Sequence, residues 1–178
     1  MASRTRKTMD SRSDCMQPEQ RRKAMQSNRG RTGPERAFAA SLWREGFRYL
    51  TSDGYRTLHG TRFPGQPDLI FTRMCVVIFV DGCFWHGCSR CHDFAADCNL
   101  AWQRKIEANR KRDHRVTMQL RRAGWRVIRI WEHGLRKASV RACIVHRVVA
   151  VLSKLPKLNK LCQGHRTPPK ALPLCVRF

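Results

Sequence analysis

The sequence predicts a mixed α/β fold, in which a mixed sheet is flanked by helices, and three observations predict it. Residues 75–80 are almost wholly apolar and β-branched, which is typical of a strand buried on both faces. Residues 125–131 alternate with the period of a strand. Between them, residues 100–123 carry apolar side chains at helical spacing. The expected order of elements is α-β-β-β-α-β-α.

The first expected helix covers residues 34–45. Thr32 and Glu35 form a T-x-x-E capping box at its start, so the reciprocal cap already gives Glu35 a complete structural role. A strand is expected to follow at residues 47–50, and the Ser-Asp-Gly sequence after it is typical of a hairpin turn. The chain would then return over residues 55–59. The last expected elements are a strand over residues 125–131 and a helix over residues 135–154.

Two carboxylates are expected at one end of the sheet. Asp68 enters the strand 69–71, Asp81 leaves the strand 75–80, and the residues between the strands are few enough for a hairpin. Mg²⁺ is a hard ion that takes oxygen ligands, so the pair is a candidate magnesium site. In the alternative interpretation neither residue binds a metal: Asp68 caps a turn, and Asp81 is a solvated polar residue of another turn.

A zinc site is predicted directly after Asp81. Cys83, Cys88 and Cys91 lie close together, and the last two have a common zinc-knuckle spacing. A closed tetrahedral site needs a fourth ligand, and a ligand from a distant element would tie the loop to the rest of the fold. Disulfides are the alternative, but no signal peptide precedes the cysteines, so a reducing compartment is expected. The candidates for the fourth ligand are His92, Cys98 and His133.

The same loop carries Phe84, Trp85 and His86. Two large aromatic side chains on a tight loop are hard to bury together, so they could pack in the core or act as a wedge between stacked bases. A neutral imidazole beside them could act as a general base toward a water molecule.

The charge of the chain predicts a polyanionic partner. The formal net charge is +23, far more than solubility requires. Eight Lys and Arg residues fall between Ala101 and Arg122, so one face of this helix is expected to contact phosphates, although a solvated charged face is the alternative. No apolar run approaches the roughly 20 residues that a membrane span needs.

The chain is expected to contain one folded domain, because 178 residues leave room for one modest core. That domain would span residues 21–155. A basic arm at residues 1–20 is expected to be disordered alone, and residues 156–178 form a basic, proline-containing tail that is expected to be flexible. The nine cysteines are odd in number and clustered, which predicts a metal site with scattered free thiols.

Three segments carry a family resemblance: PGQPDLIF, VVIFVDGCFWHGC and GWRVIRIWEH. Together they resemble the very-short-patch-repair (Vsr) mismatch endonucleases of the PD-(D/E)xK nuclease-like superfamily, over about residues 25–152. The resemblance implies a restriction-endonuclease-like core with the αβββαβα order. It also implies that the protein is a monomer located in the bacterial cytoplasm at the nucleoid. Other repair proteins are further partners that the resemblance suggests. The implied substrate is duplex DNA with a T:G mismatch, made by deamination of 5-methylcytosine and nicked 5′ of the thymine.

The resemblance also implies roles for single residues. Asp68 would bind a catalytic Mg²⁺ together with the main-chain carbonyl of Val80, and His86 would activate or orient the attacking water. Glu35 would lie near the catalytic centre in a supporting role. The structural zinc ligands would be Cys83, Cys88, Cys91 and His133. The DNA contacts would come from Met25, Phe84, Trp85, Trp102, Lys105 and Asn109.

The sequence also departs from the family pattern. The carboxylate-x-lysine half-motif of the superfamily is absent, and Val80-Asp81 stands where the best-known members carry Thr-His. Asp81 would then bind the metal, position His86, or do neither. Either Cys91 or His92 could be the third zinc ligand, and we favour Cys91.

Two other functions stay open. One is a nuclease of the same fold that acts on other DNA, in restriction or phage defence. The other is a zinc-stabilised DNA-binding module without catalysis, which would tolerate the loss of Asp68 and His86 and keep its salt-dependent affinity.

Overall fold

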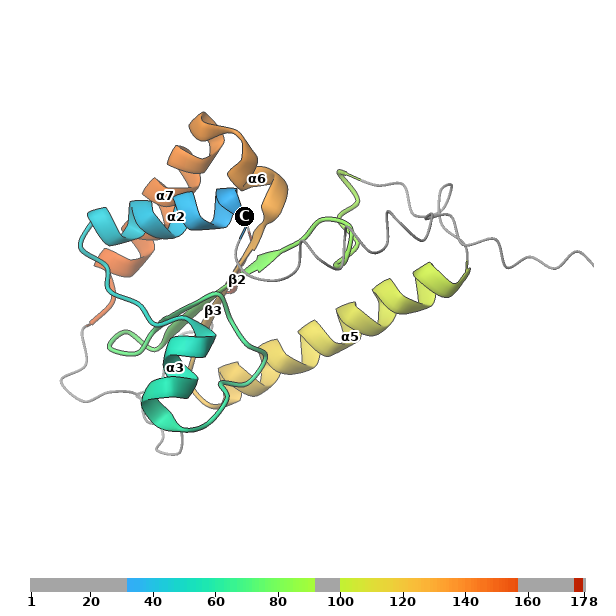
Figure 1. Ribbon diagram of the computed structural model, residues 1–178, viewed down its shortest axis with the longest axis horizontal. Coiled ribbons are helices and arrows are strands. Elements are labelled where there is room, and N and C mark those ends of the chain that lie inside the picture. Colours follow the sequence, from blue (N-terminus) through green and yellow to red (C-terminus); the bar gives the residue numbers. More distant parts are fainter. Residues whose placement is uncertain (1–31, 92–99, 157–174, 178) are drawn as a thin grey trace, which may run out of the picture.

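The computed structural model describes residues 32–91, 100–156 and 175–177 (Figure 1). Within these residues no helix is long and apolar enough to span a membrane. Met25, His92, Cys98 and the arm 1–20 lie outside them. The described elements are α2 (Gly33–Arg44), α3 (Ser52–His59), β1 (Leu69–Phe71), β2 (Val76–Asp81), α5 (Leu100–Arg122), β3 (Arg126–Trp131), α6 (Glu132–Arg136), α7 (Ala138–Ser153) and β4 (Cys175–Arg177).

The sheet is mixed, as predicted, with the strand order β1-β2-β3-β4. β1 runs antiparallel to β2, with Leu69 opposite Ile78, whereas β2, β3 and β4 are parallel. A parallel pair needs a crossover connection, and α5 provides it between β2 and β3. β4 comes from the segment expected to be a flexible tail, and the proposed domain boundaries stay predictions.

Helices cover both faces of the sheet (Figure 1). α2, α6 and α7 pack on one face, where Phe38, Leu42 and Val148 are buried against Ile78 and Ile128. α3 and α5 lie on the other face, where the apolar core is smaller. That second core contains Phe63, Ile70, Val77, Phe79, Leu120, Trp125 and Val127. Side chains alternate between the two faces along a strand, so α5 covers the face that carries Ile70 and Phe79.

The start of α2 confirms the predicted capping box. The N–H of Glu35 donates to Thr32 Oγ1 at 3.4 Å, and the N–H of Thr32 donates to Glu35 Oε2 at 3.0 Å. Both hydrogen bonds satisfy backbone donors that a helix leaves unpaired at its N-terminus.

The expected strand and hairpin at residues 47–59 are wrong. The strand is reduced to a single bridge between Leu50 and Ile70, and α3 follows it. Thr51 caps this helix, since its Oγ1 accepts a hydrogen bond from the N–H of Gly54 at 2.9 Å. Thr-Ser-Asp-Gly is therefore the capped first turn of a helix and not a hairpin turn.

The expectation of free thiols outside the metal site is correct for Cys143 and wrong for Cys75, which is disulfide-bonded. The cysteines of the predicted zinc loop are all free thiols.

Candidate active site

Asp68 and Asp81 lie at the same end of the sheet, as predicted. The N–H of Asp68 donates to the carbonyl of Ile78 at 2.9 Å, and Asp68 Oδ2 accepts a hydrogen bond from the N–H of Val80 at 2.7 Å. Asp68 has the same strand parity as Ile70, so it points to the face covered by α5. By the same alternation Asp81 shares that face with Phe79.

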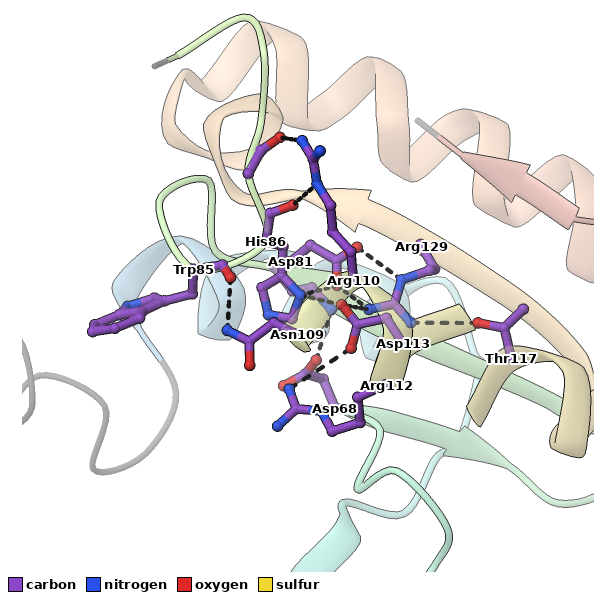
Figure 2. Close-up of polar contacts among 12 residues, drawn as sticks. Asp68, Asp81, Trp85, His86, Asn109, Arg110, Arg112, Asp113, Thr117 and Arg129 are labelled. Carbon is purple, nitrogen blue, oxygen red and sulfur yellow. Dashed lines mark hydrogen bonds and ion pairs between the residues drawn. The ribbon is translucent and has the colours of Figure 1, made fainter. Parts of the chain in front are cut away.

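Asp81 is buried and ion-paired. Arg129 Nε donates to Asp81 Oδ2 at 2.8 Å and Arg129 Nη2 donates to Asp81 Oδ1 at 2.5 Å (Figure 2). Only 2% of the Asp81 side chain and 8% of the Arg129 side chain are exposed. The interpretation of Asp81 as a solvated turn residue is therefore wrong. Arg129 itself comes from β3.

A third carboxylate, which the sequence pattern did not single out, completes the cluster. Asp113 of α5 places its Oδ2 2.5 Å from His86 Nδ1, and Arg129 Nη2 lies 3.4 Å from the same oxygen. Asp81 Oδ1 is 3.8 Å from His86 Nδ1. One sequence signal was present: Asp113 is one of two acids in a helix dominated by Lys and Arg.

The environment of Asp113 favours its ionised form. Burial would raise the pKa of this carboxyl, but the hydrogen bond and charge of His86, with Arg129 and Arg112 nearby, lower its pKa below the usual value. Asp81, His86 and Asp113 are close enough to share a metal ion. However, the guanidinium of Arg129 already supplies a positive charge between the two carboxylates.

α5 also holds the main chain of the loop that carries His86 (Figure 2). Asn109 Nδ2 donates to the carbonyl of Trp85 at 2.8 Å, and the guanidinium of Arg110 donates to the carbonyls of His86 and Gly87. Gly87 has φ +68°, and a Cβ there would come within 2.7 Å of Arg110 Nη2. The loop conformation therefore requires both a glycine and the helix beside it.

Three aromatic rings gather next to this loop. The Phe84 and Trp85 centroids are 5.2 Å apart, and Trp102 of α5 lies 5.3 Å from Phe84 and 5.7 Å from Trp85. All three rings are only partly buried, and none belongs to either apolar core. Lys105, one turn further along α5, is exposed.

The predicted zinc ligands converge on one point. The Nδ1 atom of His133, at the start of α6, lies 3.2 Å from Cys83 Sγ, 3.6 Å from Cys88 Sγ and 3.4 Å from Cys91 Sγ. Ligands of a tetrahedral Zn²⁺ are expected about 3.5 Å apart, given bonds of about 2.0–2.3 Å. The donor set therefore fits zinc. Burial, with the neighbouring Cys91 and Cys88, raises the pKa of Cys83 to about 12.

A cavity of about 640 Å³ opens beside the Asp81–Arg129–Asp113–His86 cluster. Its volume lies in the range of ligand-binding clefts. His86, Asp113 and Arg129 line it, together with Arg90, Arg110 and Arg121. The arginines make this space suitable for an anionic group.

Comparisons with known proteins identify the family of this chain. Residues 13–93 match the family model described as DNA mismatch endonuclease Vsr. The Type II nicking enzyme V.NmeDIP of Neisseria meningitidis serogroup C is 41% identical over 151 residues, which are 83% of this chain and 95% of that protein. This chain belongs to the Vsr family. The prediction of an endonuclease is thereby confirmed.

Two further relatives have lower sequence identity to this chain. The Type II nicking enzyme V.NaeI of Lentzea aerocolonigenes is 37% identical over 125 residues, covering 70% of this chain and 74% of that protein. The DNA mismatch endonuclease Vsr of Escherichia coli K12 is 34% identical over 107 residues, covering 59% of this chain and 64% of that protein.

The structure brings together most of the residues that the Vsr resemblance singled out. His86 joins Asp81 in one network, and the four zinc ligands form one cluster. Glu35 has its carboxylate in the cap of α2. Asn109, expected at the DNA, is buried and hydrogen-bonded to the Trp85 carbonyl. The roles of these residues stay predictions, as does that of Met25.

Proposed function

We propose that this Vsr-family endonuclease nicks duplex DNA on the 5′ side of the thymine in T:G mismatches that arise by deamination of 5-methylcytosine. The reaction would be a Mg²⁺-dependent phosphodiester hydrolysis. The observation that carries the proposal is the short His86–Asp113 contact at the end of the sheet where Asp68 directly precedes β1.

The proposed general base is the second ring nitrogen of His86. A carboxylate only accepts hydrogen bonds, so the imidazole places its proton on Nδ1, toward Asp113. Nε2 is then the basic nitrogen and can take a proton from the attacking water. The lowered pKa of Asp113 keeps its carboxylate ionised at neutral pH, and this charge stabilises the imidazolium that forms.

Asp68 and the carbonyl of Val80 would hold Mg²⁺, since both belong to the strand ends beside the network and offer oxygen ligands. The bound ion would stabilise the charge that develops on the phosphate and on the leaving oxygen. The arginine-lined cavity beside His86 would receive the scissile strand. Glu35 would support this site from α2.

The aromatic cluster is the proposed sensor of the mismatch. Phe84, Trp85 and Trp102 are grouped and partly exposed, and such side chains can insert between base steps. A mismatched step costs less energy to unstack than a paired one, so a wedge favours T:G sites. Lys105 and Asn109 of α5 and Met25 would add DNA contacts.

The Cys₃His cluster would hold a structural Zn²⁺. Its donors fit a closed tetrahedral site without an open position for a reacting water. The ion would fasten the loop of Phe84, Trp85 and His86 to α6. We further propose that the enzyme acts as a monomer in the bacterial cytoplasm, where it associates with the nucleoid and with other repair proteins.

A nicking assay tests the proposal. Duplexes with and without one T:G pair are incubated with Mg²⁺ and with wild type, Asp68→Ala or His86→Ala. We expect nicks beside the thymine of T:G duplexes only, and a fall of about 100-fold or more for His86→Ala, the usual contribution of a general base. Asp53→Ala on α3 and His146→Ala on α7 are matched controls at exposed positions.

The other results have defined meanings. Equal cutting of matched duplexes would replace the mismatch function by that of a nuclease acting on other DNA. Tight binding without nicking, under Mg²⁺ or Mn²⁺, would leave a non-catalytic DNA-binding module.

A further inference from the structure

We propose that Arg129 is a positioning residue that holds Asp81 away from His86 and so leaves the imidazole to Asp113. Asp81 would then be the ion-pair partner of Arg129 and not a metal ligand. The inference rests on the proposed function, because it concerns the orientation of the same general base.

Burial makes the Asp81–Arg129 pair obligatory. Both side chains are almost wholly removed from solvent, and a buried charge is very costly unless it is paired and hydrogen-bonded. Both carboxylate oxygens of Asp81 accept from the one guanidinium, at 2.8 Å and 2.5 Å. This bidentate geometry fixes the direction of the carboxylate as well as its charge.

The guanidinium is itself held in place from several sides. Its carbon lies 4.8 Å from the ring centre of Phe79, the residue opposite Arg129 in the β2–β3 register. Arg129 Nη1 also lies 3.5 Å from Thr117 Oγ1 of α5. Arg129 therefore links the sheet to the helix that carries Asp113.

Arg129 and His86 meet at a single oxygen of Asp113. Oδ2 is 2.5 Å from His86 Nδ1 and 3.4 Å from Arg129 Nη2. The two partners of this oxygen have different roles. The guanidinium of Arg129 adds positive charge beside the Asp113 carboxylate, and the carboxylate in turn orients the imidazole of His86. Asp113 is positioned by both partners.

Asp81 is the competing acceptor. Its Oδ1 lies only 3.8 Å from His86 Nδ1, and that oxygen also receives the 2.5 Å hydrogen bond from Arg129 Nη2. Without Arg129, a buried carboxylate would lose its bidentate donor next to an imidazole N–H. We expect the ring to turn toward Asp81, which moves Nε2 away from the water.

The test is a double-mutant cycle with single-turnover nicking of the T:G duplex. Arg129→Met is expected to lower kcat by about 100-fold with KM unchanged, the cost of a misplacement of about 1 Å. Asp81→Val/Arg129→Met removes the competitor together with its partner and should recover kcat to within about 10-fold of wild type. Arg126→Met, at the other end of β3, is the matched control.

Recovery is the decisive result. If Asp81 bound the metal, or if Arg129 contacted the scissile phosphate, the double variant would be no more active than Arg129→Met, and the proposal would be overturned. Should Arg129→Met not fold, Arg129→Lys serves instead, because lysine keeps the charge without the bidentate fork. We expect a partial loss of kcat, and a kcat equal to wild type would contradict the inference.

A spectroscopic readout separates this inference from the proposed function. The Nδ1 proton of His86 is expected to give a low-field ¹H NMR signal in wild type, which shifts in Arg129→Met, where its acceptor changes from Asp113 to Asp81, and returns to the wild-type position in the double variant. If no variant nicks DNA but the signal behaves in this way, the proposed function fails and the positioning role holds. A signal unchanged in Arg129→Met would overturn the positioning role whatever the activity.

Discussion

At the scale of single residues, the site is a chain of charges in which each group fixes the next. Arg129 binds Asp81 and approaches Asp113, and Asp113 binds His86. Asp113 is therefore the residue on which the orientation of the imidazole directly depends.

Asp113→Asn is expected to lower kcat by about 100-fold or more with little change in KM, because an amide can donate to the ring and stabilise the wrong tautomer. Single-turnover nicking measures the effect. Glu107→Gln, an exposed change on the same helix, is the control and should leave kcat unchanged. Equal rates for the two variants would remove Asp113 from the mechanism.

Asp113 also predicts how stability depends on pH. Its pKa is lowered in the folded protein, so its contribution is present above the pKa of the unfolded chain and is lost as pH falls through the folded value. The difference in unfolding free energy between wild type and Asp113→Asn should therefore shrink as pH falls below the usual value of 3.8. Urea titrations at several pH values measure it, and a difference that grew toward acid would contradict the prediction.

At the scale of elements, the polar residues of α5 have different surroundings. Asn109, Arg110 and Asp113 contact the loop after β2, while Lys105, one turn before Asn109, is exposed. Lys111 is exposed too, but Glu107 lies 2.7 Å from its Nζ. Lys105 and Lys111 are therefore expected to contribute differently to DNA binding, because Lys111 already has an acidic partner.

Lys105→Gln is expected to reduce the slope of log affinity for duplex DNA against log salt by about 0.9, the value for one phosphate contact. Lys111→Gln should change the slope less, because its ammonium group already has an acidic partner. Fluorescence anisotropy with a labelled duplex over a KCl series measures both slopes. Identical slopes for wild type and Lys105→Gln would show that this lysine does not contact phosphate.

The elements also show what a single sequence can and cannot predict. β2, β3 and α5 were predictable because burial on two faces and amphipathic spacing leave local patterns. α3 was missed because Thr-Ser-Asp-Gly suits both a turn and a helix start, and only packing decides. The contacts of Asp113 with His86 and Arg129 could not be predicted, since they depend on how α5 lies over the sheet. The three cysteines of the Cys₃His cluster were predictable because metal ligands restrict both spacing and residue type, whereas His133 was one of three candidates that spacing left open.

At the scale of the whole molecule, the proposed zinc ion would join parts that the sheet separates. Cys83, Cys88 and Cys91 belong to the loop after β2, which contacts α5, while His133 belongs to α6, which packs with α2 and α7. The ion would therefore connect the helical layers on both faces.

Cys91→Ser is expected to remove bound zinc and to lower the unfolding free energy by at least about 3 kcal/mol, because metal binding energy contributes to folding. Metal analysis and urea unfolding measure the two effects. Cys143→Ser is the matched control, since Cys143 is a free, exposed cysteine on α7. Unchanged zinc content in Cys91→Ser would return the third ligand to His92.

Two consecutive residues of α5, Asn109 and Arg110, hydrogen-bond the carbonyls of three consecutive loop residues, Trp85, His86 and Gly87. The loop therefore cannot swing on its own without breaking these bonds. In the proposed enzyme, the ring that probes the base stack and the imidazole that activates water would travel as one rigid body with the helix. Recognition of the mismatch and cleavage of the strand would therefore be mechanically coupled. A duplex into which the aromatic side chains insert poorly would also leave His86 out of position for the attacking water.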